Sequence, residues 1–246
     1  MFPIRDHNPS ERTPYVTYLL IAINVVVFLG QLSLDQQSEN LFIVSYGVIP
    51  ARILSGDGFE TLLTSMFIHG GFMHIIGNML FLWVFGDNLE DELGHVRFLI
   101  FYLVSGVGAA AAQILPDPGS VVPMVGASGA IAGVMGAYLL FFPKARVDVL
   151  FIIIVIIKVF PLPAWIVLGA WFALQLFNGW ATPIDGGGVA YMAHVGGFVV
   201  GFLWVVPKWL REGGPDFWRR THGHPPHPEA HYRFQESSVP TVRRRK

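Results

Sequence analysis

The sequence has no cysteine and little charge. The absence of cysteine from all 246 residues excludes a disulfide framework and any thiol chemistry. Charged residues make up only 13% of the chain, whereas 53% are hydrophobic and the mean hydropathy is +0.52. A water-soluble domain of this length carries more charge, so the composition predicts an integral membrane protein. The net charge of −1 identifies no partner, and we expect no binding to nucleic acid.

Long hydrophobic runs, by contrast, are frequent. A helix needs about 20 mostly apolar residues to cross the hydrocarbon core of a bilayer. The polar N-terminus lacks the apolar stretch of a cleaved secretory signal, so we expect the first run to be retained. The region 147–180 could hold one span or two, because Pro161 and Pro163 break it. We interpret its first part as interfacial or extended, which leaves six spans, at roughly 15–32, 62–86, 98–115, 124–142, 164–180 and 189–206.

The distribution of lysine and arginine favours six spans over seven. With six spans both ends of the chain lie on one side of the membrane. That side then carries all 16 basic residues except Arg52. Because basic residues collect on the cytoplasmic side, we expect both termini to be cytoplasmic. A seventh span would place the basic C-terminal tail outside, so we reject it.

The predicted fold is therefore an all-α membrane protein, a bundle of six transmembrane helices over residues 15–207. A cytoplasmic N-terminal segment, 1–14, precedes this core, and a cytoplasmic tail, 208–246, follows it. The tail is rich in Pro, His and Arg, and we expect it to be disordered. Its histidines could bind a metal ion, but a plain solvated tail is the preferred interpretation. The long loop 33–61 is partly apolar and could lie in the membrane interface.

Polar groups inside a span are costly and usually functional, and the second, fourth and sixth spans contain four that attract attention. His74 and Asn78 are four residues apart, so they share one face of the second span. Ser128 follows Gly126 in the first turn of the fourth span, where free N–H groups and the helix dipole can stabilise an oxyanion. His194 lies about one turn into the last span.

Each of these residues also has a purely structural interpretation. Histidine and asparagine often make hydrogen bonds between membrane helices, and serine is common among glycines on close-packed helix faces. Ser128 lies among Gly126, Gly129, Gly133 and Gly136, which fits such packing. The motif around it is also not the G-x-S-x-G elbow of soluble hydrolases, because residue 130 is alanine.

The direction of the spans strengthens the functional interpretation. In the six-span topology the fourth and sixth spans both begin at the outer face, so Ser128 and His194 lie at similar depth. His74 and Asn78 lie in the outer half of the second span. Gly197 and Gly201 in the last span are small enough to let it approach the fourth span within hydrogen-bonding distance. A nucleophile, a base and two donors in one layer are what acyl transfer requires.

We expect a Ser–His dyad, because the spans contain no carboxylate at this depth. The sequence does not indicate which group fixes the tautomer of the imidazole. No metal ion and no cofactor is required for this chemistry. A transporter or channel is the alternative from another class, but it would need polar residues at several depths of the membrane.

Three motifs in order resemble those of the rhomboid family of intramembrane serine proteases. They are HGGFMHIIGN at 69–78, GASG at 126–129 and AHVGGFVVG at 193–201, and the resemblance covers roughly residues 15–206. It implies a six-helix rhomboid-like bundle that cleaves single-pass membrane proteins near the top of their transmembrane helix, usually after a small residue. Its partners would be these substrates and the lipid bilayer. A bacterial cell (inner) membrane is the expected location.

The resemblance also implies roles for individual residues. Ser128 would be the nucleophile and His194 the general base. His74 and Asn78, with the backbone N–H of Ser128, would line the oxyanion hole, supported by Gly126. Glu90, at the cytoplasmic end of the second span, would be a structural acidic residue. The span 164–180 would act as a substrate gate.

The sequence departs from the family pattern at two places. Some members have a tyrosine one turn after the nucleophile that stacks on the catalytic histidine, whereas this chain has Ala132. A tryptophan–arginine pair before the second span is replaced by Phe59 and Glu60.

A catalytically silent relative that only binds transmembrane helices is the alternative within the family. Such proteins typically lack the serine or the histidine, and both are present here.

Overall fold

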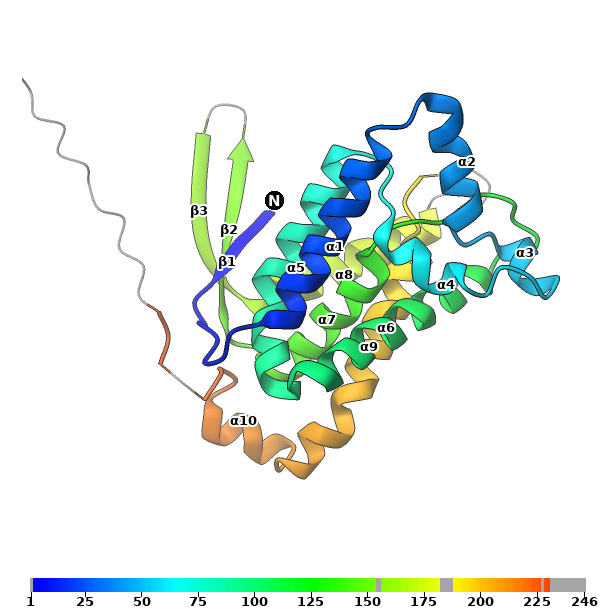
Figure 1. The fold of residues 1–246 in the computed structure, drawn as a ribbon. Coiled ribbons are helices and arrows are strands. Elements are labelled where there is room, and N and C mark those ends of the chain that lie inside the picture. The colour runs from blue at the N-terminus through cyan, green and yellow to red at the C-terminus, as the bar shows by residue number, and fades with distance from the viewer. Residues whose placement is uncertain (1, 154–155, 182–187, 227, 231–246) are drawn as a thin grey trace, which may run out of the picture.

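The fold is a bundle of helices with a small sheet beside it (Figure 1). The structure is a computed structural model that describes residues 2–153, 156–181, 188–226 and 228–230. Its elements are, in order, β1 (Phe2–Asp6), α1 (Tyr15–Gln31), α2 (Gln36–Tyr46), α3 (Pro50–Leu54), α4 (Thr61–Thr64), the 3-10 turn η1 (Ser65–Phe67), α5 (Phe72–Leu93), α6 (His95–Ile114), α7 (Ser128–Phe141), β2 (Arg146–Ile153), β3 (Ile156–Pro163), α8 (Ala164–Ala181), α9 (Tyr191–Arg211) and α10 (Pro215–Thr221).

Three helices of the described chain are long and apolar enough to cross a membrane, namely α6, α8 and α9. A fourth candidate is the pair formed by residues 61–67 and 72–93, which is bent by 96°. Two further apolar helices, α1 and α7, are shorter, with 17 and 14 residues. Together these helices agree with a membrane helical bundle.

The second predicted span, 62–86, is not one helix. The chain turns sharply at residues 68–71, and α5 begins only at Phe72. Gln31, at the end of α1, holds this turn, because its amide donates to the carbonyl of His69 at 3.0 Å and accepts from the N–H of His69 at 3.1 Å. A hydropathy window cannot detect such a short turn, since it averages over the apolar residues on both sides. The turn brings His74 into the first turn of α5.

The prediction of an all-α protein is wrong for one part of the chain. The strands form a three-stranded antiparallel sheet in the order β1-β2-β3. The interpretation of the region before Pro161 as extended is confirmed, because β2 and β3 form a hairpin there. The N-terminal segment forms β1. This strand was not predicted, because the segment is short and mostly polar.

The tail also differs from its prediction. Helix α10 lies within it, and Phe217 is buried against Phe141 with ring centroids 5.8 Å apart. The indole of Trp218 donates to the carbonyl oxygen of Leu140 at 2.8 Å. Aromatic side chains therefore anchor this part of the tail to the end of α7, although the overall composition is polar. Residues 231–246 of the predicted disordered tail lie outside the described residues.

Helices α7 and α9 touch backbone to backbone. A β-carbon at Gly197 would overlap the carbonyl oxygen of Gly129, and one at Gly201 would overlap the backbone of Gly133. Glycine lets the two helix axes approach more closely than any other residue would allow. The close approach that these glycines predicted is thus present, and it fixes how far the start of α7 lies from α9.

The carboxylate of Glu90 in α5 caps the start of α1. It accepts hydrogen bonds from the N–H of Val16 at 2.9 Å and from the N–H and hydroxyl of Thr17 at 2.7 and 2.8 Å. Helix α1 has no side-chain cap from its own first residues, so Glu90 supplies the acceptors that its free N–H groups need. Its negative charge also suits the positive end of the helix dipole. This is the structural role implied for residue 90.

A single β-carbon between α7 and α9 should therefore disturb the whole bundle. We expect Gly201→Ala to lower the free energy of unfolding by about 3 kcal/mol, because the methyl group meets backbone that cannot move aside. Thermal unfolding in detergent measures this loss. Gly169→Ala in α8 is the matched control, since nothing lies within 4 Å of its added methyl group. Equal melting temperatures for the two variants would contradict the interpretation.

Asp6 gives the fold a pH dependence. It is buried where β1 meets α7, and the hydroxyl of Tyr138 donates to its carboxyl at 2.8 Å. Burial, with the nearby charge of Asp87, raises the pKa of Asp6 from 3.8 to about 8. The folded chain therefore keeps this proton at pH values where the unfolded chain has lost it. The resulting stability is complete below pH 3.8 and is lost as the pH rises to about 8.

Asp6→Asn should flatten this dependence. In the wild-type protein the free energy of unfolding should fall by up to about 1.4 kcal/mol per pH unit between these two pKa values on account of this group. An asparagine has no proton to lose, so the variant should lack that slope. Melting temperatures from pH 4 to pH 9 test this, with the exposed Asp57→Asn as control. An unchanged slope in Asp6→Asn would assign the dependence to other groups.

Candidate active site

Ser128 and His194 are hydrogen-bonded to each other. The hydroxyl oxygen of Ser128 lies 2.8 Å from Nε2 of His194. Ser128 is the first residue of α7, and His194 lies in the first turn of α9. The backbone contact between the two helices begins one residue after the serine, at Gly129, and so holds the pair within hydrogen-bonding distance. The structure thus brings together the two residues predicted as nucleophile and base.

The other side of the imidazole is held by α8. Nδ1 of His194 lies 2.8 Å from Oε1 of Gln175. The ring of Trp171 lies against the imidazole, with centroids 5.6 Å apart and planes tilted by 36°. Neither residue was singled out from the sequence. A glutamine in a mostly apolar span was the available signal, because a polar group there needs a partner.

His74 contacts the turn that precedes Ser128. Its Nδ1 accepts a hydrogen bond from the N–H of Gly70 at 3.3 Å. Since Nδ1 accepts, the ring proton of the neutral imidazole lies on Nε2. A β-carbon at Gly126 would lie 2.6 Å from this Nε2, so the ring is packed directly against the turn. The φ angle of Gly126 is +124°, which also favours glycine.

Asn78 has a partner within its own helix. Its side-chain nitrogen donates to the carbonyl oxygen of His74 at 3.0 Å, and the residue is buried. It lines neither of the two cavities that contact Ser128. Because this bond uses one of the two amide hydrogens, one remains as a donor. The structure therefore brings His74 to the serine more directly than it does Asn78.

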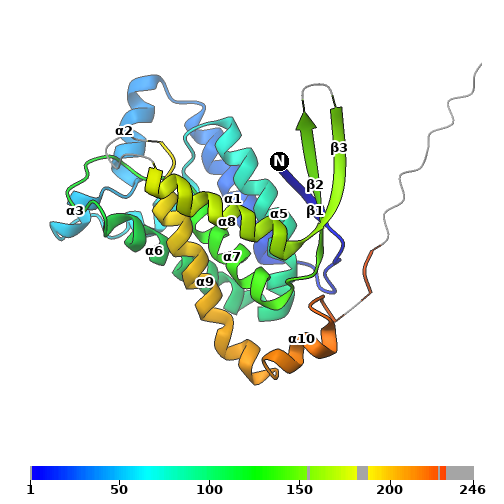
Figure 2. The ribbon, with the colours of Figure 1, turned by 180° about the vertical axis from the view of Figure 1, so that it is seen from behind.

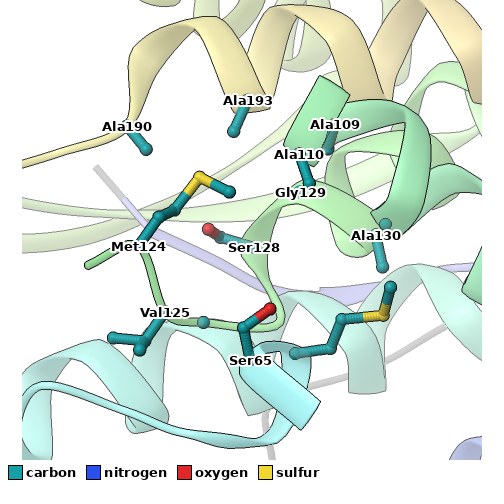
Figure 3. Close-up of a pocket in the computed structure, with 13 residues that line it drawn as sticks. Ser65, Ala109, Ala110, Met124, Val125, Ser128, Gly129, Ala130, Ala190 and Ala193 are labelled. Carbon is teal, nitrogen blue, oxygen red and sulfur yellow. The ribbon is translucent and has the colours of Figure 1, made fainter. Parts of the chain in front are cut away.

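Two cavities meet at Ser128. The smaller one has a volume of about 30 Å³, which is the size of one water molecule or a small side chain. Figure 3 shows the hydroxyl of Ser128 between α9 and the turn η1, in a lining of mostly small residues. The larger cavity, about 710 Å³, also contacts His74 and His194. This cavity lies beside both residues of the pair, and it contains room for water and a peptide segment.

The start of α7 adds backbone donors to this site. The first N–H groups of a helix have no partner within it, and here they belong to Ser128 and the residues after it. The dipole of α7 also makes this end of the helix partially positive. An oxygen that becomes negative beside Ser128 would meet these groups and the Nε2–H of His74. Within the described residues no group of three or more His, Cys, Asp or Glu side chains could hold a metal ion.

Comparison with known proteins agrees with the fold and the site. Residues 57–211 match the rhomboid domain. The chain is 31% identical over 202 residues to Rhomboid protein 1, mitochondrial, of Saccharomyces cerevisiae, an alignment that covers 78% of this chain and 54% of that protein. It is 30% identical over 208 residues to Rhomboid protease GluP of Bacillus subtilis, covering 82% of this chain and 36% of GluP.

A third relative is covered more fully. Rhomboid protease AarA of Providencia stuartii is 28% identical over 213 residues, which are 76% of this chain and 70% of AarA. The chain spans only about half the length of the yeast protein and about a third of GluP. These relatives come from bacteria and from mitochondria. The match extends over more than half of the sequence, and the chain therefore belongs to the rhomboid family.

Proposed function

We propose that this chain is an intramembrane serine endopeptidase that cleaves transmembrane segments of membrane proteins. The hydrogen bond between Ser128 and His194 carries this proposal, because it joins a nucleophile to a base at the start of a helix. Membership in a family whose relatives include named rhomboid proteases supports it. The proposed core extends over residues 15–207, and its six spans correspond to α1, α5, α6, α7, α8 and α9.

The first half of the reaction forms an acyl-enzyme. Nε2 of His194 takes the proton of Ser128 while the hydroxyl oxygen attacks the carbonyl carbon of the substrate. The carbonyl oxygen becomes an oxyanion, which the Nε2–H of His74, the amide of Asn78 and the N–H of Ser128 stabilise. The imidazolium of His194 then gives its proton to the leaving amine. The peptide bond breaks, and the acyl group stays on Ser128.

The second half of the reaction repeats these steps with water. The 710 Å³ cavity, which contacts both Ser128 and His194, supplies a path for water to the acyl-enzyme. His194 takes a proton from the water molecule, which attacks the ester carbon. The tetrahedral intermediate collapses, and Ser128 regains its hydrogen from His194. No metal ion or other cofactor enters any of these steps.

The small cavity beside Ser128 suits a small substrate side chain. Its lining includes Gly106, Ala109, Ala130 and Ala193. A side chain of the size of alanine would fit its 30 Å³, whereas a larger one would exceed this volume. We therefore propose that the bond cleaved follows a small residue in a single-pass membrane protein.

The proposed orientation places both termini in the cytoplasm. With six spans, all 16 basic residues except Arg52 lie on the side of the termini, as the positive-inside rule requires. Ser128 and His194 then lie near the opposite face of the membrane. A bacterial cell (inner) membrane is the proposed location.

A fluorophosphonate probe tests the nucleophile. Such probes react with an activated serine, so the wild-type chain in detergent should be labelled and Ser128→Ala should not. His194→Ala should lower the rate of labelling by roughly 100- to 10,000-fold, because the base is lost. Ser65→Ala, whose serine also lines the small cavity, is the control and should be labelled like the wild type. Equal labelling of wild type and Ser128→Ala would refute the assignment, and a folded but unlabelled wild type would favour a silent binder of transmembrane helices.

The role of Asn78 needs a separate test. As an oxyanion donor, Asn78→Ala should lower kcat for cleavage of a transmembrane substrate by roughly 100-fold or more and change KM little. Asn24→Ala is a matched control, since Asn24 is also buried and donates to the carbonyl oxygen four residues before it, at 2.8 Å. If both variants lose stability equally and neither loses kcat, Asn78 only supports its helix.

A further inference from the structure

Gln175 is a buried polar side chain in the apolar helix α8. That helix lies on the outside of the bundle next to α9 (Figure 2). Four of its residues are buried, and three of them, Ala164, Val167 and Leu168, lie within its first five residues. Gln175, at 7% exposure, is the only buried residue in the remainder of α8. Beyond its first five residues, the helix therefore has one fully buried side chain, and that side chain is an amide.

The hydrogen bonds of this amide fix its orientation. Its nitrogen donates to the carbonyl oxygen of Trp171, one turn earlier, at 3.3 Å. Its oxygen therefore faces Nδ1 of His194, at 2.8 Å. An amide oxygen can only accept, so Nδ1 of His194 must carry a proton. In the neutral ring Nε2 then has none, and it is free to accept the proton of Ser128.

We propose that Gln175 is a positioning residue that holds His194 in the tautomer able to act as base. This inference rests on the proposed protease function. It identifies the group that takes the place of the acidic residue of a Ser–His–Asp triad. Hydrogen bonds run in one direction, from the hydroxyl of Ser128 to Nε2, from Nδ1–H to the Gln175 oxygen, and from its amide nitrogen to the carbonyl of Trp171. A neutral amide accepts from Nδ1 as a carboxylate would, without placing a charge in the membrane.

The ring of Trp171 completes this support. It lies against the imidazole that Gln175 holds at its edge. Both side chains come from α8, four residues apart and hence on one helix face. Ala132, on α7, is too small to reach the imidazole as an aromatic residue would. The orientation of the base thus depends on the position of α8 rather than on α7, which carries the nucleophile.

A purely structural role is the competing explanation, since amides also tie membrane helices together. Two variants separate the roles. Gln175→Met keeps the length of the side chain but removes the oxygen acceptor. Gln175→Glu keeps the acceptor and adds a charge. Leu176→Ala, at a half-exposed neighbouring position, controls for disturbance of α8.

Cleavage kinetics give the main measurement. Gln175→Met should lower kcat by roughly 10- to 100-fold with little change in KM, because a misoriented base affects the reaction step rather than binding. Gln175→Glu should retain most of the activity, since its carboxylate can also accept the hydrogen bond from Nδ1–H. Leu176→Ala should behave as wild type. An unchanged kcat in Gln175→Met, or equal losses in the Met and Glu variants, would overturn the inference.

A spectroscopic measurement does not depend on turnover. The ring nitrogen shifts of His194, labelled with ¹⁵N and assigned by their absence from His194→Ala, distinguish the two tautomers. The wild type should show a proton on Nδ1, and Gln175→Met should show a mixture. A wild-type proton on Nε2 would refute the inference even if cleavage is observed. Wild type that neither cleaves nor labels would instead refute the protease function, so the two failures are distinguishable.

Discussion

The backbone contact between α7 and α9 is the constraint on which the site depends. Gly197 and Gly201 of α9 and Gly136 of α7 leave no room for a β-carbon between them and the backbone of the other helix. Without a hydrophobic effect between helices in lipid, such close van der Waals packing is a main source of association. The same contact sets the distance between Ser128 and His194 at 2.8 Å. Packing and the proposed chemistry therefore require the same residues, and the glycines around Ser128 are not an argument against catalysis.

The two histidines at the site are held in opposite tautomers by local hydrogen bonds. The N–H of Gly70 donates to Nδ1 of His74, which leaves a donor at Nε2. The oxygen of Gln175 accepts from Nδ1 of His194, which leaves an acceptor at Nε2. Both Nε2 atoms face the start of α7, one at Gly126 and the other at Ser128. One imidazole is thus suited to stabilise negative charge, and the other to take a proton.

Much of this arrangement could be predicted from the sequence, and the missing parts have physical reasons. The family expected from the three motifs is confirmed, and the contact between Ser128 and His194 followed from span direction and glycine spacing. The break before α5 and the strand β1 were not predicted, because hydropathy averages over local turns and short strands. Gln175 was visible as a polar residue in a span, but its contact with His194 depends on packing between α8 and α9, which no local pattern encodes.

Helix α8 differs from the other helices of the core in how it is attached. The hydrogen bond between Ser128 and His194 lies between two helices whose backbones cannot separate without losing their contact. The bond between His194 and Gln175 lies between α9 and a helix whose second half has no other buried residue. A displacement of α8 would therefore release the imidazole before it disturbed Ser128. In such a bundle His194, rather than Ser128, is the part of the site most sensitive to how the neighbouring membrane helix is packed.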